Sequence, residues 1–254
     1  MPNWQARGFG MAFVIILSME TKVISLFDTY DLKARFFPAF ILACVIIYRI
    51  AGYGSILSYE SFVNYSQTLR FIYGFIGLSV VLLFLWPISM IIAKLGDLMS
   101  RLIYLKNGLV IMPTTAMLLP KPASQLSKED KDLRIRIKQD YDMDLLRNRK
   151  HNKEIVAEIG YVVKRIIEKV RDEKMVTLNL TNYGVMRNLL AVFAILVFFE
   201  LCMLFCLIYD EITISSFVPL GMAILAFVIA LILMRHYGKR YSDAVYTAFL
   251  TKTN

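Results

Sequence analysis

The chain has 254 residues, of which 57% are hydrophobic, and its mean hydropathy is +0.56. Soluble domains are usually about 45–50% apolar, so this composition favours an integral membrane protein over a soluble globular enzyme. The formal net charge of +9 favours anionic partners, such as lipid headgroups, nucleotides or nucleic acid.

Side chains suited to catalysis or metal binding are scarce. The chain has two histidines, His151 and His236, and three cysteines, Cys44, Cys202 and Cys206, which all lie in apolar runs. The sequence contains no Cys-x-x-Cys pair and no phosphate-binding glycine motif. We therefore expect no enzyme, no cofactor and no metal site, and we expect the cysteines to be small buried hydrophobes.

The first 35 residues form a segment of their own. Their apolar run, residues 9–19, is too short to cross a bilayer, which takes about 20 residues. We predict an amphipathic helix that lies in the membrane interface. A retained segment resembling a signal peptide is the alternative.

Longer apolar stretches predict four transmembrane helices and hence an all-α integral membrane protein. They lie at about 36–52, 71–93, 189–209 and 217–234. The chain then divides into an N-terminal amphipathic segment (1–35), transmembrane helices 1 and 2 (36–93), a helical cytoplasmic domain (94–187), transmembrane helices 3 and 4 (188–234) and a C-terminal helix (235–254).

Basic residues gather at one end of all four stretches. They are Lys33, Arg35, Lys94, Arg101, Arg187, Arg235, Lys239 and Arg240. The two loops at the other end hold only Arg70 as a clear positive charge. By the positive-inside rule we predict a multi-pass membrane protein in which both termini and residues 94–187 are cytoplasmic.

Helical patterns dominate residues 94–187. Residues 95–105 are expected to continue the second transmembrane helix beyond the membrane, and a proline-containing link follows at 112–122. Ser127 and Asp130 resemble a capping box at the start of a helix. Residues 150–174 carry an apolar stripe that predicts a second, amphipathic helix, and residues 175–180 could form a short strand.

Two basic clusters lie in this domain. They consist of Arg134, Arg136 and Lys138, and of Arg147, Arg149, Lys150 and Lys153. One interpretation is a binding site for a nucleotide or oligonucleotide, since phosphate contacts need cations without fixed spacing. The other is a solvated face near an anionic membrane.

Glu200 is the most informative single residue, because it lies deep inside the third apolar stretch. Arg49 lies at a comparable depth in the first stretch. A carboxylate in the membrane is costly and normally faces protein or water. We expect Glu200 to face the bundle interior or a pore with Arg49 as its partner. Alternatively, Glu200 is protonated in a helix contact and Arg49 extends toward the membrane surface.

Three segments in matching order resemble a family of bacterial four-span membrane effectors from antiphage defence loci. They are YDLKARFFPAF (30–40), GLVIMPTTAMLL (108–119) and RDEKMVTLNLTNYGVMRNLL (171–190). The sequence departs from the family pattern at Val185, where an aromatic residue is usual. Some members resemble the effector of the Hailong system, which is paired with a nucleotidyltransferase. The resemblance implies an oligomeric channel controlled by a nucleotide or short-DNA signal.

The second and third of these segments flank the predicted domain and are candidates for coupling it to the membrane. The first junction consists of Pro113, Thr114 and Thr115, and the second of Tyr183, Gly184, Arg187 and Asn188. Gly184 would permit a turn, and Asn182 could cap the helix that follows. Plain helix capping and membrane anchoring is the alternative for both.

These observations lead to one functional hypothesis and one alternative. We expect a homo-oligomeric ion channel or pore that acts in antiviral defence by abortive infection, with membrane lipids and a nucleotidyltransferase as partners. A nucleotide or oligonucleotide would bind its basic cytoplasmic domain. The alternative is a membrane scaffold or sensor that recruits a soluble protein and conducts nothing.

Overall fold

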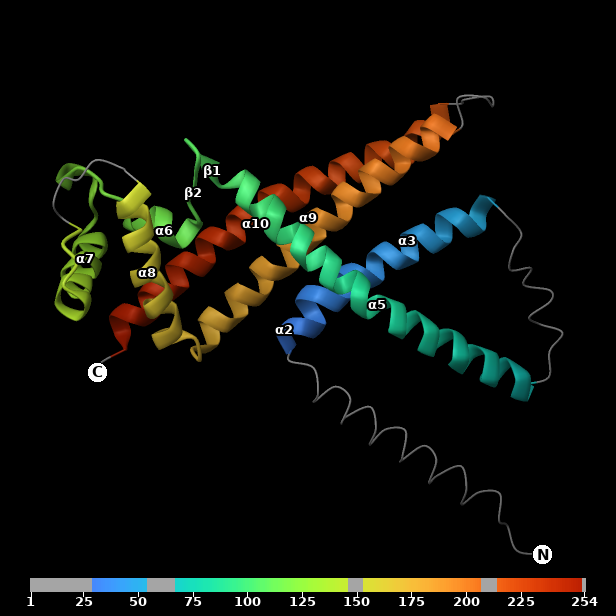
Figure 1. Cartoon of the computed structure of the whole chain (residues 1–254), viewed down its shortest axis with the longest axis horizontal. Helices are drawn as coiled ribbons and strands as arrows, with labels where there is room; N and C mark the ends of the chain where they lie inside the picture. The colour runs from blue at the N-terminus through green and yellow to red at the C-terminus, as the bar shows by residue number, and fades with distance from the viewer. Residues whose placement is uncertain (1–28, 54–66, 146–152, 207–213, 253–254) are drawn as a thin grey trace, which may run out of the picture.

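The computed structural model describes residues 29–53, 67–145, 153–206 and 214–252, and these are almost wholly helical (Figure 1). The segment for which an N-terminal amphipathic helix is predicted lies largely outside the described residues. Two long helices, α9 and α10, run side by side through the molecule. The other elements pack at the middle and at one end of this pair.

The first helical run contains α2 (Thr29–Asp31), the π-helical turn η1 (Leu32–Phe36) and α3 (Phe37–Tyr53). Pro38 lies at the start of α3 and has no backbone N–H, so it cannot donate to a carbonyl of the preceding turn. The π-helical turn directly precedes this proline. The run corresponds to the first predicted transmembrane stretch.

Helix α5 (Gln67–Ile103) contains the second apolar stretch, and the expected continuation of this helix past residue 95 is confirmed. A two-residue hairpin follows, with strands β1 (Leu105–Lys106) and β2 (Leu109–Val110). Its turn residues, Asn107 and Gly108, both have positive φ. An Asn-Gly pair favours this turn because both residues tolerate that conformation.

A lobe of short helices follows the hairpin. It contains α6 (Pro113–Leu118), the 3₁₀ turn η2 (Ala123–Gln125), α7 (Lys128–Tyr141) and α8 (Lys153–Val170). The predicted capping box is confirmed, because Ser127 Oγ accepts from the Asp130 N–H at 3.1 Å and Asp130 Oδ2 accepts from the Ser127 N–H at 3.4 Å.

Helix α9 (Lys174–Cys206) and helix α10 (Val218–Thr251) are each continuous, and the 3₁₀ turn η4 (Ile214–Phe217) precedes α10. The short strand considered at residues 175–180 is therefore wrong. The domain boundaries expected after residues 187 and 234 fall inside single helices. At 1.5 Å per residue each helix is about 50 Å long, which exceeds the ~30 Å hydrocarbon core of a membrane.

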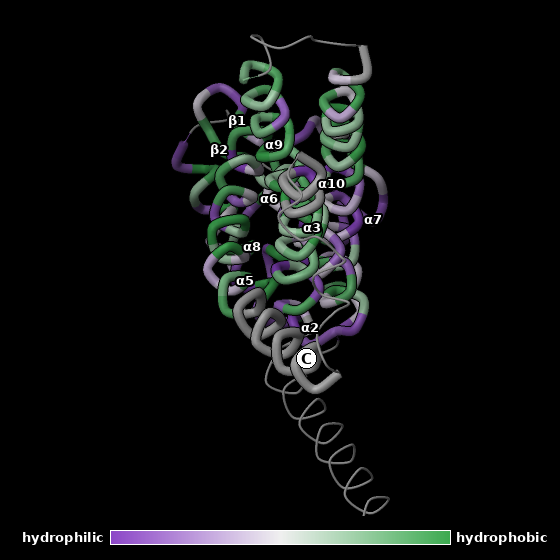
Figure 2. Tube along the Cα trace, turned by 90° about the vertical axis from the view of Figure 1, so that its right-hand side faces the viewer, coloured by the Kyte–Doolittle hydropathy of each residue, from purple (hydrophilic) through white to green (hydrophobic). Residues whose placement is uncertain are grey.

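Three helical segments are long and apolar enough to cross a membrane: Leu83–Ile103, Lys174–Cys206 and Val218–Thr251. Hydrophobic residues predominate along these segments (Figure 2), and many of their large apolar side chains are exposed. Cys44 on α3 and Cys202 and Cys206 on α9 are all exposed, so the expectation that the cysteines are buried is wrong. With lipid as the surrounding medium, an apolar side chain gains little by turning inward.

The lobe has a hydrophobic core of its own, which α10 completes. Ile159, Ile166 and Val170 of the predicted stripe on α8 are fully buried. They pack in one cluster with Val245 and Phe249 from the C-terminal part of α10. The last turns of α10, expected to be a separate C-terminal helix, are therefore the central element of the lobe.

Candidate functional site

A bidentate ion pair joins α3 to α9. Arg49 Nε donates to Glu200 Oε1 at 2.9 Å, and Arg49 Nη2 donates to Glu200 Oε2 at 2.7 Å. Glu200 is only 4% exposed. Two parallel charge-assisted hydrogen bonds satisfy both carboxylate oxygens. The structure contains the expected pairing, and this geometry is incompatible with an arginine that extends away from the carboxylate.

The pair lies in the most apolar part of α9. Glu200 follows Asn188 by 12 residues, which is about 18 Å along a helix. Neighbouring residues of α9, such as Phe198 and Phe205, expose about 70% of their surface on the outside of the bundle. A buried charge pair inside such a segment is a candidate functional site.

Asn188 is fully buried where α9 meets the first helical run. Its Nδ2 donates to the carbonyl oxygen of Ala34 at 2.5 Å. Pro38, four residues after Ala34, has no N–H with which to continue the α-helical hydrogen bonding to that carbonyl. The asparagine therefore supplies a donor that the proline removes. Among the described residues, Asn188 Oδ1 has no hydrogen-bond partner.

Helix α5 packs closely against α9 at the same point. A Cβ added to Gly96 would lie 2.6 Å from Asn188 Oδ1 and 3.0 Å from the carbonyl oxygen of Arg187. On the adjacent turn, Arg187 Nη1 lies 3.7 Å from Asp97 Oδ1. We call this meeting of Ala34, Gly96, Asp97, Arg187 and Asn188 the helix crossing.

The two predicted coupling junctions meet beside the helix crossing. The ring of Tyr183 on α9 stacks on Tyr241 of α10, with centroids 6.5 Å apart and planes inclined by 8°. A Cβ added to Gly238 would lie 3.1 Å from Pro113 of α6. A cavity of about 120 Å³ is lined by Pro113, Thr114, Tyr183, Arg187, Gly238 and Tyr241.

Helix α6 is attached to α10 by a buried hydrogen bond. Tyr246 Oη donates to the carbonyl oxygen of Thr114 at 2.6 Å, and both Thr114 and Thr115 are buried. The first junction is thus held against α10, although it follows α5 in the sequence. Thr114 and Tyr246 are 132 positions apart in the sequence and yet lie in one contact region.

The second junction has a different local structure from the one predicted. The turn at Gly184 and the helix cap at Asn182 are wrong, because α9 passes through both positions without a break. Gly184 lies in the helix, where an added Cβ would be 2.8 Å from Tyr30 Oη. The glycine makes room for an aromatic ring of the first helical run.

Arg134 does not belong to a surface anion site, so that prediction is wrong. The residue is 1% exposed, and it donates to the carbonyl oxygens of Leu145 and Leu119, both at 2.8 Å, and of Met117 at 3.3 Å. Burial lowers the pKa of its guanidinium from the ordinary value. Arg134 thus connects α7 to the segment that precedes it and to the segment that follows it.

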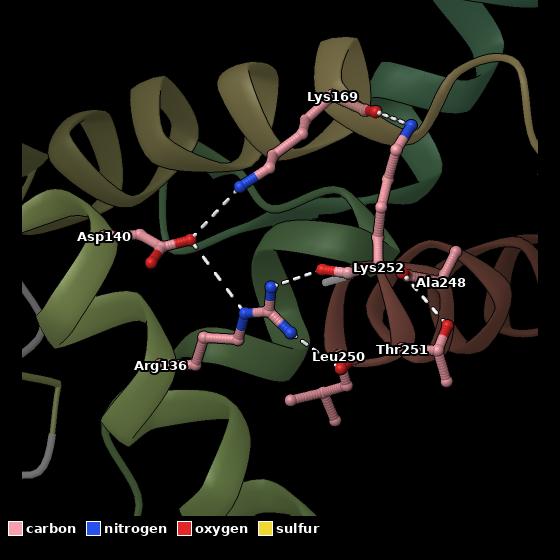
Figure 3. Close-up of polar contacts among 7 residues, drawn as sticks. All are labelled: Arg136, Asp140, Lys169, Ala248, Leu250, Thr251 and Lys252. Atoms are coloured by element: carbon pink, nitrogen blue, oxygen red, sulfur yellow. Dashed lines mark hydrogen bonds and ion pairs between the residues drawn. The ribbon is translucent and has the colours of Figure 1, made fainter. Parts of the chain in front are cut away.

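Arg136 caps the C-terminal end of α10 (Figure 3). Its Nη1 donates to the carbonyl oxygen of Leu250 at 2.6 Å, and its Nη2 donates to that of Lys252. Lys252 Nζ in turn donates to the Lys169 carbonyl oxygen at 2.8 Å. A cation at this end satisfies free carbonyls and opposes the negative end of the helix dipole.

The remaining residues of the basic clusters are less constrained. Lys138 is exposed and lies 2.9 Å from the carboxylate of Asp144. Lys153 is exposed at the start of α8. Arg147, Arg149 and Lys150 lie outside the described residues.

Sequence reasoning missed Tyr104 and Gly238. A Cβ added to Gly238 would lie 3.0 Å from Tyr104 Oη, which is buried and has no hydrogen-bond partner among the described residues. Burial, and secondly the nearby Tyr183, raises the pKa of Tyr104 to about 12. The Asn107-Gly108 pair could have revealed the hairpin that turns the chain back at this point.

In the part of the chain that the structure describes, no group of three or more His, Cys, Asp or Glu side chains is placed to hold a metal ion. No protein-family model, no curated protein and no solved structure matches the chain. Function is therefore argued from the ion pair, the helix crossing and the lobe.

Proposed function

We propose that the protein is an oligomeric ion-conducting effector of a bacterial inner membrane, controlled by an anionic signal. The observation that carries this proposal is the buried Arg49–Glu200 pair. Well-packed hydrophobic residues would hold α3 against α9 at similar or lower cost than two desolvated charges. A role in ion passage accounts for the charges better than a role in packing does.

The proposal places four helices across the membrane. Helix α3 is the shortest, with 17 residues, and its ion pair to α9 gives it a place in the bundle. Basic residues at the helix crossing, together with those at Arg235, Lys239 and Arg240, put this level at the cytoplasmic surface. The lobe and both termini are then cytoplasmic.

Several copies are needed for conduction in this proposal. Within the described residues, one subunit offers a single buried carboxylate, and one such group cannot line a wide pore. Symmetric assembly would repeat Glu200 around an axis, as rings of acidic side chains do in cation channels. The exposed apolar surface of the helices is available to lipid and to neighbouring copies.

Helices α9 and α10 provide the mechanical link. Each runs without interruption from the lobe into the apolar region, so a displacement of the lobe moves both helices as rigid bodies. The stacked Tyr183 and Tyr241 and the buried Thr114–Tyr246 contact hold these helices and α6 together. A signal bound to the lobe can therefore reach the ion pair along α9.

The proposed signal is a nucleotide or short oligonucleotide, made by a partner nucleotidyltransferase. This part rests on the resemblance to antiphage effectors and on the basic residues that the sequence holds between positions 138 and 153. The remaining candidates for contact with it are Lys138, Arg147, Arg149, Lys150 and Lys153. Phosphate binding by such a set would depend strongly on salt concentration.

Ion flux from proteoliposomes tests the proposal directly. We expect the wild-type protein to release a trapped cation and the Glu200→Gln variant to release it at least tenfold more slowly. Glu168→Gln is the matched control, since Glu168 is an exposed carboxylate on α8. The channel proposal is overturned if purified wild-type protein is monomeric, or conducts nothing and only retains a soluble partner, as a scaffold would.

A cellular experiment tests the defence role. Expression together with the proposed partner nucleotidyltransferase is expected to depolarise the membrane after phage infection and to reduce plaque formation. The Glu200→Gln variant should show neither effect while reaching the membrane in the same amount. Unchanged protection by this variant would contradict the role given to the ion pair.

A further inference from the structure

A pocket with a strong positive charge lies at the outer side of the helix crossing, apart from the ion pair. It has a volume of about 480 Å³, and its charged lining comes from three elements. Arg35 belongs to η1, Lys94, Asp97 and Arg101 belong to α5, and Arg187 belongs to α9. We call it the basic pocket. Four cations against one carboxylate leave three positive charges in its lining.

The arrangement of these charges leaves the pocket open to an anion. Asp97 lies 2.9 Å from Arg101 Nε and 3.7 Å from Arg187 Nη1, so one carboxylate holds two guanidinium groups side by side. Arg35 pairs with Asp31 outside the lining, and even with that carboxylate counted two positive charges remain. Lys94 is exposed, and Arg187 Nε has no hydrogen-bond partner among the described residues.

The pocket lies where the apolar part of the helices ends. On α5, Lys94 follows Ile91 by three residues and therefore lies on the same face. Ile91 is 57% exposed, and Met90, four residues before Lys94 and so on the same side of the helix, is 48% exposed. A molecule in the basic pocket would thus have cations at one end and an apolar surface at the other.

From this combination we infer that the basic pocket binds the phosphate headgroup of an anionic phospholipid, whose acyl chains lie along α5. Basic pockets between transmembrane helices on the cytoplasmic side recognise anionic headgroups in this way. The site rests on the membrane placement in the proposed function, and it does not depend on conduction. Because the lipid would contact η1, α5 and α9 together, it would stabilise the helix crossing.

Native mass spectrometry and thermal unfolding of the full chain in detergent test the inference. We expect phosphatidylglycerol to remain bound and to raise the midpoint temperature of unfolding, and phosphatidylcholine to do neither. The Lys94→Gln/Arg101→Gln variant should bind phosphatidylglycerol at least tenfold more weakly, since each cation near the surface contributes about 1 kcal/mol. The control is Lys131→Gln/Lys164→Gln, which removes two exposed charges from the lobe and should bind the lipid as the wild type does.

A third arm separates a lipid from a soluble anion. Glycerol phosphate, which offers a phosphate group without acyl chains, is expected to give no shift at millimolar concentration. The inference is overturned if glycerol phosphate reproduces the full shift, if both lipids act alike, or if the two variants lose affinity equally. These measurements do not depend on ion flux. A protein that binds the lipid but does not conduct would therefore refute the channel proposal and leave the lipid site standing.

Discussion

Asn188 of α9 donates its side-chain amide to the carbonyl oxygen of Ala34, 154 positions earlier in the chain. The hydrogen bond compensates for Pro38, whose ring nitrogen cannot donate to that carbonyl. The first helical run and α9 are thus joined, because a side chain of α9 donates to a carbonyl that the proline leaves without an α-helical donor. This contact fixes the position of α3 along the axis of α9. It thereby brings Arg49 of α3 to the level of Glu200.

The Asn188→Ala variant should lose this connection. Removing the amide leaves a buried carbonyl without its donor, which costs about 1–3 kcal/mol of unfolding free energy. Denaturant titration in detergent micelles would measure the loss. Asn179→Ala is the control, because the Asn179 amide donates within its own helix, to the Met175 carbonyl oxygen. Equal effects of the two substitutions would contradict the role of Asn188 in joining the helices.

Gly96→Ala is expected to disrupt the helix crossing. The added methyl group would lie 2.6 Å from Asn188 Oδ1 and 3.0 Å from a backbone oxygen, so α5 and α9 would have to separate. Such overpacking typically costs about 1–3 kcal/mol.

Gly160→Ala on α8 provides the matched comparison, since nothing lies within 4 Å of its added methyl group. An alanine inside a helix is favoured over glycine by about 0.8–1 kcal/mol, so this variant should be stabilised. Thermal unfolding in detergent would show shifts of opposite sign. A stabilised Gly96→Ala variant would refute the close crossing of α5 and α9.

The Tyr104→Phe variant tests the buried hydroxyl group through the pH dependence of the unfolding free energy. The pKa of Tyr104 is raised to about 12, above the value of 10 for a free phenol, so the folded state holds the proton more tightly than the unfolded chain. Its contribution to stability is complete below pH 10 and is lost as the pH rises through 12. The phenylalanine variant should lose less stability than the wild type between these pH values. Parallel curves would contradict this assignment.

Helix positions could be predicted from the sequence where a single local rule decides them. The capping box at Ser127 and Asp130 marks the start of α7, and the apolar stripe of α8 marks the face that is buried. The pairing of Arg49 with Glu200 was expected from their comparable depth in the first and third apolar stretches. An unpaired amide at the start of a helix, or an unpaired charge in an apolar stretch, would cost free energy. Few arrangements of nearby residues avoid that cost, so they can be recognised in the sequence.

Other features depend on packing between distant segments. Arg134 looks like a surface cation in sequence, yet the carbonyls that surround it come from chain on both sides of α7. Gly184 suggests a turn, and only the ring of Tyr30 shows that the glycine is needed for space. The continuity of α10 past Met234 was missed because its polar end is buried by the lobe, which a local pattern does not show.

The Arg49–Glu200 pair can be tested for coupling apart from conduction. Replacing one partner, as in Glu200→Leu or Arg49→Met, leaves a buried charge unpaired and should cost about 3–5 kcal/mol of unfolding free energy. The double variant should be less destabilised than either single variant, because neither charge remains. The same cycle on Lys164 and Glu168, an exposed pair 4.0 Å apart, should show a coupling below about 0.5 kcal/mol. Additive losses at Arg49 and Glu200 would show that the two charges are not coupled. If the double variant folds and assembles but releases no cation from liposomes, the charges are needed for passage and not for the fold.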